Sequence, residues 1–243
     1  MKTTYFITGT SKGIGNALAG FLLPNASHTI YGYARGPSDL DSKNYIHSQL
    51  DLSNPAVLQD FVFPETKDER IVLVNNAGLI NPIAHGGHQD FATMQKQLNI
   101  NVLAPMQLCN QFIKQFSGSN AKLIIINISS GAGKSPIDGW STYCASKAAI
   151  DLFSQTIALE SELNNTGLKI YAIAPGVVDT PMQREIRTAD KKQFSRLDHF
   201  IELNKNKDLT SPEIVVKKLD YIIRHSSEFP SVLLSLRDIE IQK

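Results

Sequence analysis

The chain has 243 residues, of which 42% are hydrophobic and 19% are charged, a composition that suits a globular protein with a sizeable core. Its 24 lysines and arginines nearly balance its 23 acidic residues, so the net charge of +1 argues against a nucleic-acid-binding or membrane-surface protein. Cys109 and Cys144 are the two cysteines, and no metal-ligand spacing occurs, which favours a reduced protein that binds no metal.

The N-terminal stretch "MKTTYFITGT" reaches a glycine within nine residues and lacks the apolar segment of a signal peptide. No apolar run in the chain approaches the roughly 20 residues of a membrane span. We therefore expect a cytoplasmic protein with neither a membrane nor a nucleic acid as partner.

Short apolar runs alternate with helix-like segments along the whole chain. The runs are rich in Ile, Val, Leu and Tyr and lack clean alternation, as expected of strands buried on both faces. They cover residues 4–9, 28–34, 70–78, 122–130, 168–176 and 231–236. This order predicts an α/β fold, a single Rossmann-like domain over residues 1–243 with a doubly wound parallel sheet flanked by helices.

The first strand leads into a glycine turn, "FITGTSKGIGNALAGFLL". Gly9, Gly13 and Gly15 have the spacing G-x-x-x-G-x-G, which differs from the common dinucleotide spacing G-x-G-x-x-G. Glycines allow a tight turn and a close approach of a pyrophosphate, and the following helix offers free N–H groups at its positive end. A purely structural turn is the alternative, but the strand before and the helix after favour a nucleotide cofactor.

The end of the second strand bears on which cofactor binds. An NAD site usually presents an acid here to the ribose 2′-hydroxyl. In this chain Arg35 follows the strand, the nearest acid is Asp39 in a Pro/Ser turn, and Lys12 adds a cation in the glycine turn. The two cations favour a 2′-phosphate and hence NADP(H), unless both are merely solvated.

A tyrosine and a lysine share one helix face in "STYCASKAAI", since Tyr143 and Lys147 are four residues apart. A free phenol has a pKa of about 10 and becomes a useful acid–base group only if a nearby cation stabilises its anion. Ser130 ends the strand upstream, where sites lie in this architecture, and Asn101 falls in a probable helix before it. Alone, each of the last two residues could be structural.

Seven motifs together resemble the classical short-chain dehydrogenase/reductase family. They are "TGTSKGIG", "LDLSN", "NNAG", Asn101, Ser130, "YCASK" and "APGVVDT", in the family's order between residues 8 and 180. Within the family, "NISSGAGKSPIDGWSTYCASK" and "APGVVDTPMQREIR" look most like the benzil reductase and sepiapterin reductase branch.

The resemblance implies a role for each matching residue. Tyr143 would give a proton to the substrate oxygen, Ser130 would hydrogen-bond that oxygen, and Lys147 would hold the nicotinamide ribose. Asn101 would bind a water that links Lys147 to solvent. The implied cofactor contacts, besides Tyr143 and Lys147, are Gly9, Ser11, Lys12, Gly13, Ile14, Gly15, Arg35, Asp51, Leu52, Asn76, Ala77, Gly78, Pro175, Gly176, Val178 and Thr180.

Three features leave alternatives open. The polar segment 180–210 predicts either a partly helical lid over the crevice or an ordinary surface excursion. Trp140 either walls a pocket for an aromatic substrate or packs in the core. His85 and His88 could touch substrate, although solvated loop histidines are the more common case.

The motifs predict an NADPH-dependent reductase of a small ketone or dicarbonyl, benzil-like or sepiapterin-like. Another substrate, such as a β-ketoacyl thioester, a sugar or a steroid, would suit the same residues, and a sensor that binds NADP(H) without turnover is a third hypothesis. The resemblance also implies a homodimer or homotetramer, often built by pairing the helices that begin near 101 and 145. Apolar residues for such a contact are available at Ala148, Leu152, Ile157 and Leu163, unless they pack in the core.

Overall fold

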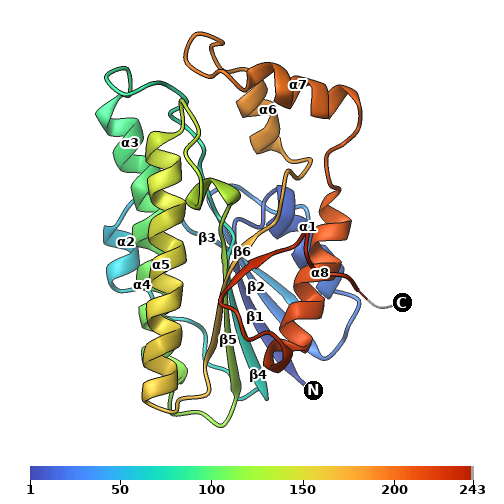
Figure 1. The fold of residues 1–243 in the computed structure, drawn as a ribbon. Helices are drawn as coiled ribbons and strands as arrows, with labels where there is room; N and C mark the ends of the chain where they lie inside the picture. The colour runs from blue at the N-terminus through green and yellow to red at the C-terminus, as the bar shows by residue number, and fades with distance from the viewer. Residues whose placement is uncertain (242–243) are drawn as a thin grey trace.

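The computed structural model describes residues 1–241, whose strands form one seven-stranded parallel sheet (Figure 1). The strands are β1 (Thr3–Thr8), β2 (His28–Ala34), β3 (Tyr45–Gln49), β4 (Arg70–Asn75), β5 (Lys122–Ile128), β6 (Lys169–Ala174) and β7 (Leu233–Ser235). Their order is β3-β2-β1-β4-β5-β6-β7. The direction of winding reverses between β1 and β4, and a parallel sheet has its ligand crevice at the carboxyl ends beside such a reversal. The doubly wound parallel sheet predicted from the sequence is confirmed.

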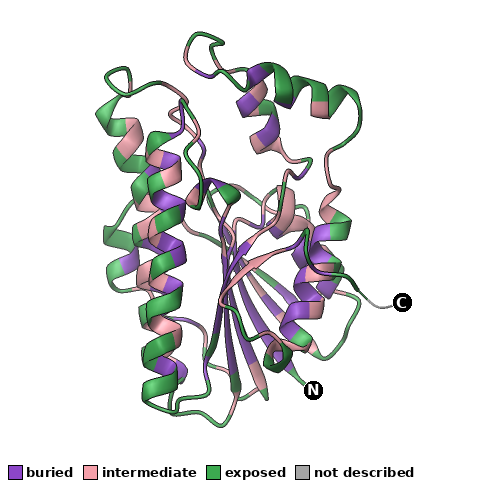
Figure 2. Cartoon of the chain, viewed as in Figure 1, coloured by how far each residue is buried: buried purple, intermediate pink, exposed green. Residues whose placement is uncertain are grey.

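Helices cover both faces of the sheet because the buried strands present apolar side chains to both (Figure 2). Tyr5 and Ile7 pack in one cluster with α1 and α8, while Phe6 between them packs in a second cluster with Phe112 of α4. The helices are α1 (Gly13–Leu22), α2 (Ala56–Gln59), α3 (Phe91–Leu98), α4 (Ala104–Phe116), α5 (Ser141–Leu163), α6 (Pro181–Arg187), α7 (Leu197–Lys205) and α8 (Pro212–Arg224). A π-helical turn (Asn99–Leu103) joins α3 to α4.

One strand was not expected from the sequence. β3 (Tyr45–Gln49) lies at the edge of the sheet, and of its residues only Tyr45 is buried. Because its sequence, YIHSQ, has no apolar run, its strand character depends on the pairing with β2. The six apolar runs predicted from the sequence each contain a strand, although β7 is only three residues long.

Most of the segment 180–210 forms a small lobe that contains α6 and α7 and stands over the carboxyl end of the sheet (Figure 1). Phe194, Leu197 and Phe200 of this lobe are buried. They form a third apolar cluster with Ile80 and Trp140. The segment is therefore packed on the body of the protein at the place expected of a lid.

Candidate active site

The turn after β1 is shaped by the side chain of Asn76. Its Nδ2 donates hydrogen bonds to the carbonyl oxygens of Thr8 at 3.0 Å and Gly9 at 3.3 Å. Gly9 has a φ of +76°, and a methyl group built on it would stand 2.8 Å from Asn76 Nδ2. A methyl group on Gly15 would stand 2.4 Å from the same atom and from the Gly9 oxygen. Both positions therefore require glycine, one for its backbone conformation and both for space.

The amino end of α1 faces this turn and has no side-chain cap. Its first N–H groups are free to receive an anion, and the helix dipole adds a partial positive charge there. A narrow glycine cradle beside uncapped N–H groups fits the pyrophosphate of a dinucleotide cofactor.

A cavity of about 720 Å³ extends from the glycine turn to the lobe. Its lining contains every residue predicted to bind cofactor or substrate except Gly15, which lies beneath the turn, and the catalytic candidate Asn101 is also outside the lining. The predicted residues in the lining are Gly9, Ser11, Lys12, Gly13, Ile14, Arg35, Asp51, Leu52, Asn76, Ala77, Gly78, Ser130, Trp140, Tyr143, Lys147, Pro175, Gly176, Val178 and Thr180. The fold thus brings together residues from six of the seven sequence motifs, with Arg35 and Trp140 besides.

Tyr143 and Lys147 lie on the buried face of α5, each 6% exposed, with Lys147 Nζ 5.6 Å from the centre of the Tyr143 ring. Nζ donates a hydrogen bond of 2.8 Å to the carbonyl oxygen of Ile128, at the end of β5. Ser130 follows that strand, lines the cavity beside Tyr143, and accepts a hydrogen bond of 3.2 Å from Ala132 N at its hydroxyl. The phenol, the ammonium and the hydroxyl therefore meet at one end of the cavity.

Burial changes the acidity of both α5 groups. It raises the pKa of Tyr143 to about 12, although the nearby Ser130 hydroxyl acts in the opposite direction. It also lowers the pKa of Lys147 to about 8, and the nearby negative charge of Asp151 opposes that change. At neutral pH Tyr143 is therefore protonated and can donate a proton, while Lys147 remains mostly charged.

Asn101 is buried in the π-helical turn, and its side chain forms hydrogen bonds with the backbone that follows β4. Its Oδ1 accepts from Leu79 N at 2.8 Å, and its Nδ2 donates to Leu79 O at 2.8 Å. A methyl group built on Gly78 would lie 3.7 Å from Asn101 Oδ1 and 3.9 Å from Lys147 Nζ, so both side chains approach the same point. The side chain of Asn101 thus braces the wall next to Lys147, while its expected water contact stays a prediction.

The adenosine end of the cavity has charges of both signs. Arg35 and Lys12 are exposed and line it, whereas Asp39 does not. Asp51 also lines it, and hydrogen bonds from the Ser53 side chain and backbone lower the pKa of its carboxyl group. Two cations without a fixed acid at the end of β2 fit a ribose 2′-phosphate.

Aromatic side chains form the wall of the cavity beneath the lobe. Trp140 stacks on Phe194, with ring centres 5.2 Å apart and planes at 14°, and meets Tyr143 edge-on at 5.5 Å. Trp140 is 5% exposed, so it both lines the cavity and packs in the third apolar cluster. Phe200, which also lines the cavity, was not singled out from the sequence because lobe and sheet meet only in the fold.

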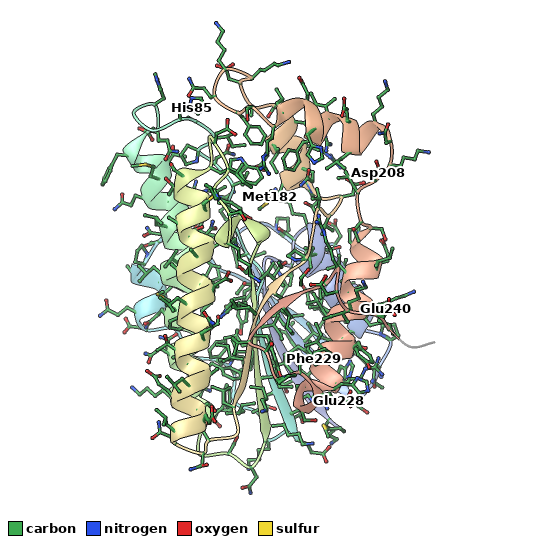
Figure 3. The ribbon with its side chains drawn as sticks, in the orientation of Figure 1. His85, Met182, Asp208, Glu228, Phe229 and Glu240 are labelled. Carbon is green, nitrogen blue, oxygen red and sulfur yellow. The ribbon has the colours of Figure 1, made fainter. Side chains whose placement is uncertain are left out.

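Side chains at the start of the lobe complete this end of the cavity. Met182, near the beginning of α6, lies between the lobe and the body of the protein (Figure 3). Its flexible thioether side chain suits a wall that accommodates ligands of different shape.

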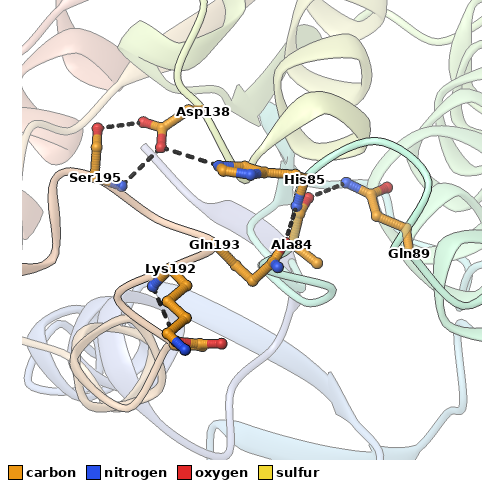
Figure 4. Close-up of polar contacts among 8 residues, drawn as sticks. Ala84, His85, Gln89, Asp138, Lys192, Gln193 and Ser195 are labelled. Carbon is orange, nitrogen blue, oxygen red and sulfur yellow. Dashed lines mark hydrogen bonds and ion pairs between the residues drawn. The ribbon is translucent and has the colours of Figure 1, made fainter.

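The lobe is fastened to two neighbouring loops by polar contacts (Figure 4). Asp138 accepts hydrogen bonds from the Ser195 backbone N–H at 2.7 Å and from its hydroxyl at 2.8 Å. His85 lies 3.5 Å from the same carboxylate, and its backbone N–H donates to Gln193 Oε1 at 2.9 Å. His85 and His88 do not line the cavity, and His85 instead joins the loop after β4 to the lobe.

Two features are missing from the described residues, a membrane-spanning helix and a metal-binding cluster. Within residues 1–241, no helix has the length and apolar character needed to cross a membrane. The same part of the chain contains no group of three or more His, Cys, Asp or Glu side chains that could hold a metal ion.

Comparisons with known proteins agree with this geometry. A family model described as short chain dehydrogenase matches residues 3–191. A benzil reductase ((S)-benzoin forming) of Bacillus subtilis (strain 168) is 35% identical over 92% of this chain and 94% of its own length. The protein of the same name from Bacillus cereus is 38% identical, with the same shares covered. Among solved structures, a short-chain dehydrogenase/reductase from Saccharomyces cerevisiae superposes with a TM-score of 0.83 at 25% identity, covering 98% of this chain and 97% of the other.

Proposed function

The chain belongs to the short-chain dehydrogenase family and is an oxidoreductase of CH–OH and C=O groups, and within that activity we propose that it is an NADPH-dependent reductase of aryl ketones and vicinal diketones. The observation that carries the proposal is the position of Tyr143. Its phenol is buried, protonated at neutral pH, beside Ser130 in the cavity and in edge contact with the aromatic wall.

The residues of the cavity suit a reduction by hydride and proton. When bound, the reduced nicotinamide supplies the hydride for the carbonyl carbon. Tyr143 transfers its proton to the carbonyl oxygen, and the Ser130 hydroxyl stabilises the negative charge that develops on that oxygen. Lys147 holds the nicotinamide ribose and stabilises the phenolate left on Tyr143 until it regains a proton.

Three features support the choice of cofactor and substrate. Arg35 and Lys12 offer positive charge to a 2′-phosphate, which favours NADPH over NADH. Trp140 and Phe200, whose ring planes are tilted by 46°, give two apolar ring surfaces against which an aryl group can pack. The two Bacillus relatives are benzil reductases, and benzil is an aryl vicinal diketone.

The experiment measures NADPH oxidation by the purified protein with benzil, a pterin ketone, a β-ketoacyl thioester, a sugar and a steroid. We expect the highest kcat/KM with benzil and at least a tenfold preference for NADPH over NADH. If the protein reduced one of the other substrates but not benzil, the proposed substrate class would be wrong and that substrate would indicate the correct class. Tight NADPH binding without turnover of any carbonyl would indicate a sensor instead.

Two variants test the assigned groups, each beside a matched control. Tyr143→Phe is expected to lose more than about 10²-fold in kcat while still binding NADPH, because proton transfer is worth about that much. Tyr221→Phe, on α8, should leave turnover unchanged. Arg35→Ala should raise the Kd for NADPH about tenfold and leave that for NADH unchanged, and Lys122→Ala, at the opposite end of the sheet, should change neither.

We also propose a homo-oligomer, as the family resemblance implies. Leu152, Leu159 and Leu163 are 66%, 55% and 72% exposed along α5. Large apolar side chains that gather on one helix favour contact with another protein surface. Light scattering coupled to gel filtration would give the mass, and a monomer at micromolar concentration would contradict the proposal.

A further inference from the structure

A third titratable group continues the row of Tyr143 and Lys147 along α5. Asp151 is one helical turn beyond Lys147, and residues four apart share a helix face. All three side chains are buried, with Asp151 7% exposed. Asp151 does not line the cavity, and the proposed reaction gives it no role.

The carboxylate of Asp151 is held in a defined place. Its Oδ1 accepts a hydrogen bond of 2.5 Å from the hydroxyl of Ser129. Ser129 is fixed in turn, because its backbone N–H donates to Ile173 O of β6 at 2.8 Å. On the other side, a methyl group built on Gly133 would stand 2.8 Å from Oδ2 and 3.0 Å from the Lys147 carbonyl carbon. Because Gly133 has no side chain, the Asp151 carboxylate can occupy this space.

Burial raises the pKa of the Asp151 carboxyl group, whereas the hydrogen bond from Ser129 and the charges of Lys134 and Lys147 lower it. Lys147 lies on the same helix, and Lys134, which is exposed, follows the turn after β5. Lys147 Nζ donates its hydrogen bond to Ile128 O and not to Asp151. The carboxylate therefore acts on the ammonium through its electric field. Such an effect is strong in a site of low dielectric constant. Tyr143 and Cys144 are the titratable groups nearest the other end of the row.

We propose that Asp151, held by Ser129, is a positioning residue whose fixed negative charge keeps the buried Lys147 ammonium protonated at the pH at which the enzyme works. Asp151 acts on the protonation of Lys147 even in the protein without cofactor or substrate. Only the expected effect of Asp151 on turnover rests on the proposed function.

The electrostatic sign determines what removal of the charge does. Burial already lowers the pKa of Lys147 to about 8, and Asp151 opposes that change. Asp151→Asn keeps the shape and an oxygen that can accept from Ser129, but it removes the charge. The pKa of Lys147 should then fall by about one unit, a tenfold change in proton affinity. Lys147 would consequently be mostly neutral at pH 7.5.

The first test follows the titration of Lys147 by NMR in protein labelled at the lysine ε-carbon, with the resonance assigned by its loss in Lys147→Met. We expect the midpoint in Asp151→Asn about one pH unit below that of the unchanged protein. Glu160→Gln neutralises an exposed acid on the same helix and should leave the midpoint in place. Ser129→Ala, which frees the carboxylate, should lower the midpoint by a smaller amount and serves if Asp151→Asn does not fold.

The second test records the pH profile of kcat/KM for carbonyl reduction. The alkaline limb should move to lower pH by the same amount in Asp151→Asn, with a change of less than about threefold at pH 6.5. A folded Asp151→Asn whose Lys147 midpoint lies within 0.3 unit of the unchanged protein would overturn the proposal. Because the NMR titration needs no substrate, failure to reduce any carbonyl would count against the proposed function and not against this inference.

Discussion

Replacing Lys147 by methionine should stabilise the cofactor-free protein, because a buried ammonium is costly. Burial lowers the pKa of Lys147 from 10.5 to about 8. Each pH unit corresponds to ~1.36 kcal/mol, so the gap of about 2.5 units makes the charge cost about 3 kcal/mol at pH 7. The lost hydrogen bond to Ile128 O offsets ~1 kcal/mol of the gain. We expect Lys147→Met to be about 2 kcal/mol more stable at pH 7.

The sign of the pH dependence distinguishes this explanation from a simple packing effect. The folded pKa is the lower one, so the unfolded chain binds more protons between pH 8 and 10.5 and the cost disappears as the pH rises through that window. At pH 9.5 the remaining cost is about 1.4 kcal/mol, so the advantage of Lys147→Met should shrink by about 2 kcal/mol.

Urea unfolding of both proteins at pH 7.0, 8.0, 9.0 and 9.5, without cofactor, measures this difference. Apart from Asp151, whose pKa the charge of Lys147 lowers, the other titrating groups are common to the two chains and cancel in the comparison. Lys169→Met, an exposed lysine at the start of β6, should show a difference that does not vary with pH. A constant difference between Lys147→Met and the unchanged protein, within 0.5 kcal/mol over the range, would refute the assignment of a charged, buried Lys147.

Three further substitutions have defined outcomes. Gly15→Ala forces Asn76 and the Gly9 carbonyl apart, so NADPH affinity in a fluorescence titration should fall more than tenfold; unchanged affinity would mean that the turn can relax. Asp138→Ala releases Ser195, and steady-state kinetics should show a KM for the carbonyl raised roughly threefold to tenfold with kcat within twofold, whereas an unchanged KM would separate these contacts from substrate binding. Phe194→Ala removes a fully buried ring from the aromatic wall and should lower the free energy of unfolding by about 3–5 kcal/mol in urea; a loss under 1 kcal/mol would contradict tight packing there.

Local sequence patterns were sufficient for much of the fold. Strands such as β4 and β5 are buried on both faces and therefore stand out as nearly continuous runs of Ile, Val and Leu. Gly9 and Tyr143 belong to motifs with fixed spacing, because backbone geometry and helix periodicity dictate which neighbours can meet. These patterns predicted the parallel sheet, the glycine turn and the phenol–ammonium pair.

Features that depend on contacts between distant segments could not be predicted from the sequence. β3 is polar and becomes a strand only by pairing with β2. The aromatic wall needs Trp140 beside Phe194 and Phe200 of the lobe, and nothing local to any of them encodes that contact.

Asp151 illustrates the same limit at the site itself. The sequence by itself determined that it shares a helix face with Tyr143 and Lys147, since that follows from helical periodicity. Only the tertiary structure decided that this face is buried against Ser129 and Gly133. A carboxylate acts strongly on a neighbouring charge only where water is excluded, and the exclusion of water is a property of the assembled fold.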